Sequence, residues 1–217
     1  MTVLPFHTAD DVAAVAPLVS EHLSDRGLLA YPTETVYGLG SRARAEDLAA
    51  LARLKGRPLG KPFLLLVSSQ MMALDRGLEF TPAARALAER FWPGPLTLVL
   101  PGGEGALPDG LRGPEGGIAV RWTSQVQTAR LIAEIGEPIT STSANRPGEV
   151  TAPGVGALAD SFADAIDAGR LLVLDGGVLG NVPPSTLVDC TGPEPKLVRD
   201  GAIPRVELRA GVGRYAP

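Results

Sequence analysis

The chain of 217 residues has few of the side chains that usually bind metals or form cross-links. It contains one cysteine, Cys190, and two histidines, His7 and His22. A single cysteine excludes a disulfide framework within the chain and any cysteine-based zinc cluster. The two histidines have no third ligand nearby, so a built-in transition-metal site has little support. We therefore expect no metal site formed by the protein alone.

The sequence also lacks a long apolar run and a targeting segment. The longest aliphatic run, residues 63–67, is far shorter than the ~20 residues of a membrane-spanning helix. Asp10 and Asp11 interrupt any signal-peptide pattern near the N-terminus. Apolar residues make up 45% of the chain and charged residues 20%, which is enough for a sizeable core. We expect a soluble, cytoplasmic, globular protein with no membrane partner.

The sequence carries no excess of positive charge. It has 20 basic and 24 acidic residues and a net charge of −4. This balance excludes a general nucleic-acid coat but allows a local basic cleft. Only three lysines occur, Lys55, Lys61 and Lys196, and the first two lie close together. Because the compact ammonium differs from the guanidinium used elsewhere in the chain, this cluster is either functional or a chance grouping.

Predicted helices and strands alternate along the chain. Apolar periodicity and capping residues predict helices at 8–23, 45–54, 82–91, 124–135 and 155–166. Short apolar runs predict strands at 28–31, 63–67, 96–100, 118–122, 138–141, 171–174, 186–189 and 196–199. This alternation predicts an α/β fold in one domain over residues 1–217, with seven or eight strands. Two hairpin-like joins near the C-terminus favour a mixed sheet, and we expect residues 211–217 to form a loose tail.

Two glycine-rich stretches are similar to nucleotide-binding motifs but fail in their details. Gly38-x-Gly40-x-x-Ala43 follows a long loop instead of a tight turn, and no acidic residue ends the next strand. The segment 56–62 is one residue short of a P-loop and has Pro62 where a magnesium-binding hydroxyl belongs. We therefore reject both a dinucleotide site and a Walker-type ATPase.

Four polar loops follow predicted strands and indicate a binding site. They span residues 33–38, 55–58, 141–145 and 185–186. Arg121 and Arg199 each end a strand, and ligands of α/β sheets bind in the crevice beyond the strand ends. Hydroxyls and cations suit phosphates and a zwitterion where the protein supplies no nucleophile. Turn chemistry explains each loop alone, but not the four together with Lys55 and Arg57. We expect Lys55 to be a loop cation outside any core.

Short motifs from residue 28 to residue 204 occur in a characteristic order: YPTETVYGLG, KGRP, WPGPLT, IAVR, STSAN, STLVD and VRDGAIP. In these motifs the chain resembles the YrdC-like threonylcarbamoyl-AMP synthases, in their short bacterial form. Two departures from the family pattern lie beside the motifs. Trp122 and Thr123 stand where the family usually has a small apolar residue and proline, and Arg146 and Pro147 replace the more usual Ser-Gly.

The resemblance implies a fold and a reaction. The fold is a single α/β domain, with a twisted mixed sheet flanked by helices around an open basic cavity. The substrates are L-threonine, bicarbonate or CO2, and ATP, and the products are threonylcarbamoyl-AMP and pyrophosphate. A transfer complex passes the product on to form N6-threonylcarbamoyladenosine in tRNA, and we expect at most weak tRNA binding by this chain. Mg2+ accompanies ATP, and no tightly bound organic cofactor is expected.

The resemblance also implies which residues hold each substrate. The candidate catalytic set, at the ATP phosphates and the carboxylated intermediate, is Lys55, Arg57, Ser143 and Asn145. The further residues at the nucleotide are Thr97 and Arg199. The residues at threonine are Thr33, Arg121, Ser141 and Ser185. Arg121 is expected to grip the threonine carboxylate with its guanidinium fork, and Tyr37 either lines the pocket or belongs to the core.

Two alternative functions come from other classes. The first is a module that binds tRNA or double-stranded RNA, but the acidic chain has no aromatic stacking motif. The second is a carbamoyl-adenylate-forming enzyme of metallocofactor maturation, whose catalytic domain is similar. That enzyme carries acylphosphatase-like and zinc-finger modules, for which this chain has neither the length nor the cysteines.

Overall fold

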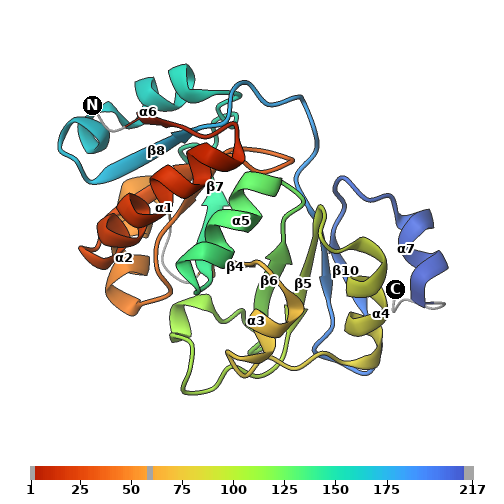
Figure 1. The fold of residues 1–217 in the computed structure, drawn as a ribbon. Coiled ribbons are helices and arrows are strands. Elements are labelled where there is room, and N and C mark those ends of the chain that lie inside the picture. Colours follow the sequence, from red (N-terminus) through yellow and green to blue (C-terminus); the bar gives the residue numbers. More distant parts are fainter. Residues whose placement is uncertain (1–2, 58–60, 213–217) are drawn as a thin grey trace.

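The computed structural model describes residues 3–57 and 61–212, which form one α/β domain around a single sheet (Figure 1). Its strands are β1 (Val3–Pro5), β2 (Leu28–Tyr31), β3 (Gly38–Gly40), β4 (Leu64–Val67), β5 (Leu96–Leu100), β6 (Ile118–Trp122), β7 (Ile139–Ser143), β8 (Leu171–Asp175), β9 (Thr186–Asp189) and β10 (Lys196–Arg199). Their order in the sheet is β1-β8-β2-β3-β7-β4-β6-β5-β9-β10. Since β2–β8 and β4–β6 are parallel pairs while β3–β7 and β5–β6 are antiparallel, the predicted mixed sheet is confirmed.

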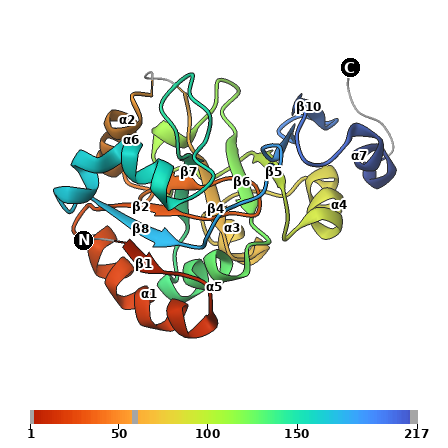
Figure 2. The same cartoon turned by 90° about the horizontal axis from the view of Figure 1, so that it is seen from above.

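Helices cover both faces of the sheet. They are α1 (Ala9–Ser24), α2 (Ala45–Lys55), α3 (Gln70–Leu74), α4 (Pro82–Phe91), α5 (Val126–Ile135), α6 (Val155–Asp167) and α7 (Arg205–Val212), with a 3-10 turn at Asp109–Leu111. Helices α1 and α5 lie on one face, and α2 and α6 lie on the other (Figure 2). No helix of the described residues is long and apolar enough to cross a membrane.

Alternation along the central strands produces these two layers. In β2, Leu29 and Tyr31 belong to a buried cluster that includes side chains of α1 and α5. Leu28 and Ala30, at the positions between, belong to a second cluster that includes side chains of α2 and α6. A strand buried on both faces needs an almost continuous apolar sequence, which explains why the LLAY segment is entirely apolar apart from one hydroxyl.

Capping residues set the helix ends that matter for the site. Helix α1 begins at a capping box, in which the Thr8 hydroxyl accepts from the Asp11 N–H at 3.0 Å and the Asp11 carboxylate accepts from the Thr8 N–H at 2.8 Å. Helix α2 ends at Gly56, whose left-handed backbone (φ 66°) terminates the helix between Lys55 and Arg57. The turn at Gly56 therefore places these two cations at the end of one helix.

The structure adds elements that apolar patterning did not predict. Strands β1 and β3 and helices α3 and α7 were missed, and β3 begins at Gly38, the last residue of the polar loop expected at 33–38. Of the two joins expected to be hairpin-like, β9–β10 is antiparallel, but β8 lies between β1 and β2, so the β8–β9 prediction was wrong. Helix α7 includes Gly211 and Val212 of the expected tail. Residues 213–217 of the expected tail lie outside the described residues. So do residues 58–60, the first of which ends the polar loop expected at 55–58.

We expect Gly40→Ala to destabilise the sheet. A Cβ at Gly40 would lie 2.2 Å from the backbone oxygen of Thr140 on β7, so the strands would have to shift. Overpacking of this kind costs about 1–3 kcal/mol, which urea unfolding would measure. The matched control is Gly156→Ala in α6, where a Cβ meets nothing within 4 Å and the stability should be unchanged or raised. Equal stability of the two variants would contradict the close approach of β3 and β7.

Candidate functional site

A cavity of about 760 Å³ opens over one face of β5, β6 and β9. Its floor includes every second residue of these strands, namely Thr97 and Val99, Ala119 and Arg121, and Leu187 and Asp189. The residues between them, such as Leu98, Val120 and Val188, are fully buried in the core on the opposite face. The period of two thus separates a core face from a ligand face. We had expected the cavity to lie beyond the strand ends. It also extends over the face of the sheet itself.

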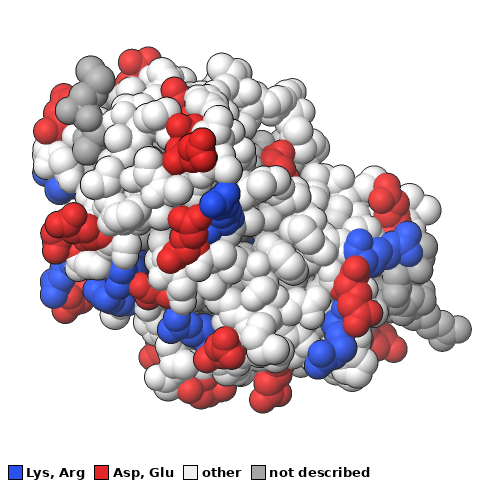
Figure 3. All heavy atoms as spheres, in the orientation of Figure 1, with Lys and Arg blue, Asp and Glu red and all other residues white. Residues whose placement is uncertain are grey.

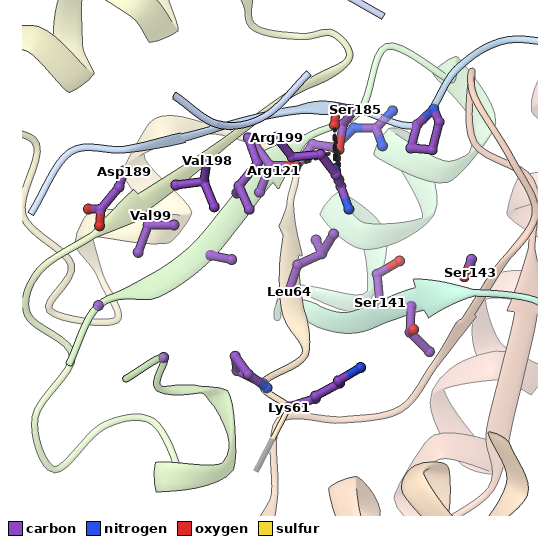
Figure 4. A pocket seen from close by; sticks show the side chains of 18 of the residues that line it. Lys61, Leu64, Val99, Arg121, Ser141, Ser143, Ser185, Asp189, Val198 and Arg199 are labelled. Carbon is purple, nitrogen blue, oxygen red and sulfur yellow. Dashed lines mark hydrogen bonds between the residues drawn. The ribbon is translucent and has the colours of Figure 1, made fainter. Parts of the chain in front are cut away.

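Eight of the ten residues expected to bind substrates line this cavity. They are Thr33, Arg57, Thr97, Arg121, Ser141, Ser143, Ser185 and Arg199. The lining also carries Lys61, Lys196 and two carboxylates, Glu115 and Asp189. Figure 4 shows Arg121, Ser185 and Arg199 grouped on one side, with Lys61 and the serines of β7 elsewhere on the wall. We expected the cavity to be basic. This stays a prediction, because one of its arginines, Arg121, is paired with the carboxylate of Glu34.

The other two residues, Lys55 and Asn145, are not part of the cavity lining and bind each other. The Lys55 ammonium donates to the backbone oxygens of Ser143 and Asn145 at 2.6 and 2.8 Å, and to Asn145 Oδ1 at 2.9 Å. Ser143 Oγ lies 3.2 Å from the same nitrogen. The side chain is only 6% exposed and belongs to the last turn of α2, so the expectation of a loop cation outside the core was wrong. Lys55 joins the end of α2 to the end of β7.

The environment of Lys55 makes its charge less favourable than in water. Burial and then the nearby charge of Arg57 lower the pKa of Lys55 to about 8, so the ammonium form still dominates at neutral pH. Four oxygen acceptors around three N–H groups satisfy that charge. We infer that Lys55 shapes the Ser143–Asn145 turn and leaves Ser143 at the cavity surface.

Arg57 is the cation that reaches the cavity from this helix end. Its Nη1 donates to the hydroxyl of Thr142 at 3.0 Å, and its Nη2 donates to the backbone oxygen of Pro62 at 2.7 Å. The guanidinium also stacks over the Phe63 ring, 4.8 Å from the centroid. Burial lowers its pKa, but an arginine stays charged. Thr142, which we had not assigned a role, thus helps to orient Arg57 and lines the cavity beside it.

Arg121 is held from several sides. Its Nη2 forms an ion pair with Glu34 at 2.7 Å, and both terminal nitrogens donate to the Thr35 hydroxyl at 3.2 and 3.3 Å. Its Nε donates to the backbone oxygen of Gly94 at 3.3 Å. The fork that we expected to face threonine is therefore turned toward the β2–β3 loop. Neither Glu34 nor Thr35 was among the expected site residues.

Glu34 accepts hydrogen bonds from the start of α5 as well as from Arg121. The Thr123 hydroxyl donates to its Oε2, and the Ser124 N–H donates to its Oε1 at 3.1 Å. Burial by itself would raise the pKa of Glu34, but the charge of Arg121 and these hydrogen bonds outweigh it and lower the pKa below 4.5. Thr123 belongs to the first of the two departures from the usual family pattern, at Trp122 and Thr123. The departure therefore supplies a donor to a buried carboxylate.

Arg199 forms a separate cluster with Ser185 and Thr97. Its Nε and Nη2 donate to the backbone oxygen of Ser185 at 3.2 and 2.9 Å, and Nη2 lies 3.2 Å from Ser185 Oγ. The hydroxyls of Ser185 and Thr97 are 2.8 Å apart. Burial and then the charge of Arg121 lower the pKa of Arg199, so the two guanidinium groups are close enough to repel each other. Ser185 therefore adjoins the two residues that we expected at the nucleotide.

Two further expectations concern the loop that follows β2. The Thr33 hydroxyl donates to the Val36 oxygen at 2.7 Å, so it closes its own turn while it lines the cavity. Tyr37 is fully buried, and its hydroxyl donates to the Gly177 oxygen at 2.8 Å and accepts from the Gly176 N–H at 3.0 Å. The choice left open for Tyr37 is thus resolved in favour of the core.

A family model of the Sua5, YciO and YrdC proteins, described as telomere recombination, matches residues 21–201. The chain belongs to the Sua5/YciO/YrdC family. A threonylcarbamoyl-AMP synthase of Thiobacillus denitrificans is 36% identical over 183 residues, which cover 84% of this chain and 94% of that protein. The synthase of Pyrococcus abyssi is 35% identical over 187 residues, 86% of this chain and 54% of that one. The chain spans about half the length of the Pyrococcus abyssi and Bacillus subtilis relatives.

Solved structures are similar over almost the whole chain. P. abyssi Sua5 complexed with L-threonine has a TM-score of 0.85 and 31% identity, and the match covers 98% of this chain and 61% of that one. E. coli YciO has a TM-score of 0.77 and 25% identity, and the match covers 95% of this chain and 98% of that one. The α/β fold with a mixed sheet is therefore the fold of this family.

We expect Lys55→Met to destabilise the protein. The variant keeps an aliphatic side chain but removes the ammonium donor. The backbone oxygen of Asn145 is then left without a donor among the described residues, whereas the Ser143 oxygen keeps the Asn145 N–H and Asn145 Oδ1 keeps the Ser143 hydroxyl. Unpaired buried polar groups cost about 1–3 kcal/mol each, so urea unfolding should show a loss of at least about 1 kcal/mol. The control is Lys61→Met, at an exposed position on the cavity edge, with an expected change below about 0.5 kcal/mol. If the two variants are equally stable, Lys55 does not tether β7.

The lowered pKa of Glu34 predicts a pH dependence with a defined sign. Because the folded pKa lies below the unfolded value of 4.5, the stabilisation is complete above pH 4.5 and is lost as the pH falls through the folded pKa. In Glu34→Gln this contribution is absent. The stability difference between the wild type and Glu34→Gln should therefore be largest at neutral pH and shrink in acid, as measured by urea unfolding at several pH values. A constant difference across that range would show that Glu34 titrates normally.

Proposed function

We propose that the chain is an L-threonylcarbamoyladenylate synthase, an enzyme of the nucleotidyltransferase class. It joins L-threonine, bicarbonate or CO2, and ATP into threonylcarbamoyl-AMP and releases pyrophosphate. The product then serves the N6-threonylcarbamoyladenosine modification of tRNA through a separate transfer complex. ATP and tRNA are cytoplasmic substrates, so we place the reaction in the cytoplasm.

The observation that carries this proposal is one cavity in which arginines are interleaved with hydroxyls from several strands. A volume of about 760 Å³ falls in the range of ligand pockets, and it suits a nucleotide together with a small amino acid. The relatives named threonylcarbamoyl-AMP synthase and the Sua5 structure complexed with L-threonine support the same substrates. Among the described residues that line the cavity there is no histidine or cysteine that could act as a nucleophile.

The proposed reaction needs positioning more than it needs covalent chemistry by the protein. The uncharged amine of threonine attacks the carbon of CO2 and loses a proton, which gives an N-carboxylate. An oxygen of that carboxylate attacks the α-phosphorus of ATP, and the bond to the pyrophosphate oxygen breaks. Orientation of such partners can supply ~7–11 kcal/mol of the barrier. Fixed N–H donors aimed at the developing negative charge supply further stabilisation.

We assign the residues to the two substrates by their clusters. Arg57 with Ser143, and Arg199 with Thr97, face the ATP phosphates and the carboxylated intermediate. Thr33, Ser141 and Arg121 hold threonine, and Ser185 lies where the two groups meet. Lys55 and Asn145 act indirectly by shaping the turn that carries Ser143.

Mg2+ enters this proposal only as the companion of ATP. No group of three histidine, cysteine, aspartate or glutamate side chains in the described residues is arranged to hold a metal ion. A resident metal therefore does not fit the donors present. Phosphate oxygens and water are the usual ligands of nucleotide-bound Mg2+, and we route no step through it.

The RNA-binding alternative predicts a continuous basic surface. On the face shown in Figure 3, basic and acidic side chains are interspersed and form no basic stripe. Binding through phosphates would also decline steeply with salt, which a titration with tRNA at two salt concentrations would detect. The carbamoyl-adenylate alternative is distinguished by testing whether carbamoyl phosphate replaces threonine and bicarbonate.

The proposed function is tested by pyrophosphate release from ATP and bicarbonate, with and without L-threonine, and by mass analysis of the nucleotide product. We expect threonine-dependent release and the mass of threonylcarbamoyl-AMP. Release triggered only by carbamoyl phosphate or by another amine would contradict the substrate assignment. No turnover of ATP under any of these conditions would favour the RNA-binding alternative.

Within this assay, Arg199→Ala should raise the KM for ATP about tenfold or more, because a charge-assisted contact to phosphate is lost. The matched control is Arg205→Ala, which removes an exposed arginine paired only with Asp200 and should leave the KM unchanged. An unchanged KM in Arg199→Ala would remove Arg199 from the nucleotide site.

A further inference from the structure

Thr123 is buried and Glu34 is half-buried, and neither lines the cavity. Glu34 is 18% exposed, whereas Thr123 is fully buried. Between them they connect the β2–β3 loop to the turn that leads from β6 into α5. Both contacts end on the carboxylate that pairs with Arg121, which does line the cavity.

The contacts of Arg121 involve four of its five N–H groups. Hydrogen bonds run from Nε to Gly94 and from Nη1 and Nη2 to Thr35, and Nη2 also forms the ion pair with Glu34. The contact with Glu34 holds Nη2 against the protein. The remaining N–H, on Nη1, has no acceptor among the described residues. It is therefore the group that Arg121 can offer to a ligand in the cavity.

Glu34 is the strongest of these anchors. Its bond to Nη2 is the shortest, at 2.7 Å, and it is the anchor that carries a charge. Arg121 is only 4% exposed, so little water is available to replace a lost partner, and a guanidinium without Glu34 would turn to find another acceptor. The orientation of the free N–H therefore depends on where Glu34 is held.

Thr123 in turn helps to hold Glu34. Its hydroxyl donates to Oε2, the same oxygen that accepts from Arg121, while the Ser124 N–H binds Oε1. These donors fix both oxygens and hence the plane of the carboxylate. A proline at position 123 would have no hydroxyl to donate, so the departure from the usual family pattern adds a contact that the usual proline could not make.

We propose that Glu34, held by Thr123, is a positioning residue that presents one N–H of Arg121 to the carboxylate of the amino-acid substrate. This inference rests on the proposed function for the identity of that substrate. The threonine carboxylate then takes a single hydrogen bond from Arg121 instead of a two-point fork. The hydroxyls of the cavity wall supply the other contacts.

Thr123→Val gives the sharpest test, because it removes the hydroxyl and changes no charge. We expect the KM for threonine to rise about three- to tenfold, with kcat changed by less than about twofold and the KM for ATP unchanged. Thr123→Ser restores the hydroxyl and should restore the KM. Thr123 Oγ1 also accepts from the Gln125 N–H near the start of α5. Thr81→Val is therefore the matched control, since it removes a similar bond at the start of α4.

Variants of Glu34 separate positioning from charge. Glu34→Ala should raise the KM for threonine about tenfold or more, whereas Glu34→Gln, which keeps an oxygen acceptor, should raise it less. If Glu34 acted only as a competing negative charge, both variants would lower the KM and Thr123→Val would have no effect. That pattern would overturn the proposal. Glu46→Ala, which removes an exposed partner of Arg26, is the control for loss of a glutamate.

A crystal structure of ligand-free Glu34→Ala tests the positioning role independently of any substrate. We expect the Arg121 guanidinium to leave Thr35 and Gly94. If it keeps both bonds, the proposal is overturned, whatever the enzyme acts on. If the guanidinium moves but the wild type forms no threonine-dependent product, the proposed function fails and the positioning role stands. Should Glu34→Ala not fold, the structure and kinetics of Thr123→Val decide the question in the same way.

Discussion

The buried ammonium of Lys55 joins the end of α2 to the end of β7. Lys55 is the last residue of α2, and its acceptors are Ser143, at the end of β7, and Asn145, in the turn that follows. One charge therefore links a helix to a central strand of the sheet. Such a charge is tolerated only because oxygens surround it, since an unpaired buried cation would be too costly to remain charged. The same turn carries Ser143 to the cavity surface, and Arg57 follows Lys55 by two residues. The positions of several expected site residues therefore depend on this tether.

The arginines of the cavity are oriented by the protein before any ligand is bound. Arg57, Arg121 and Arg199 each donate to backbone oxygens or hydroxyls, and Arg121 also has a counter-ion. Donors fixed in this way need little reorganisation when negative charge develops nearby, which is the physical basis of electrostatic preorganisation. The cost is that few N–H groups remain for substrates. The site therefore offers single, directed donors, and hydroxyls must complete the recognition of each anion.

Sequence patterns predicted the strands in which residues facing the core alternate with residues facing the cavity. Strand β6 carries Val120 toward the core and Arg121 toward the cavity, and an apolar run ending in arginine is visible in the sequence. Strand β3 was missed because its two glycines give no strand signal, and it is a strand because β2 and β7 enclose it. The burial of Lys55 was missed because its acceptors lie 88 and 90 residues further along the chain. Glu34 was missed for the same reason, since Thr123 is 89 residues away.

The Glu34–Arg121 pair also determines how charge is distributed over the cavity. A buried pair contributes almost no net charge, and it is retained at a cost in desolvation that a pair of apolar residues would avoid. The pair is therefore explained by the orientation that it gives to Arg121, and not by a gain in the stability of the fold. With Arg121 neutralised by Glu34, the arginines of the wall that form no ion pair with the described residues are Arg57 and Arg199, both of which we assign to phosphates. In the role that we propose, Arg121 recognises a carboxylate by direction and not by field strength, so a zwitterion and a polyphosphate can share one cavity without competing for the same cation.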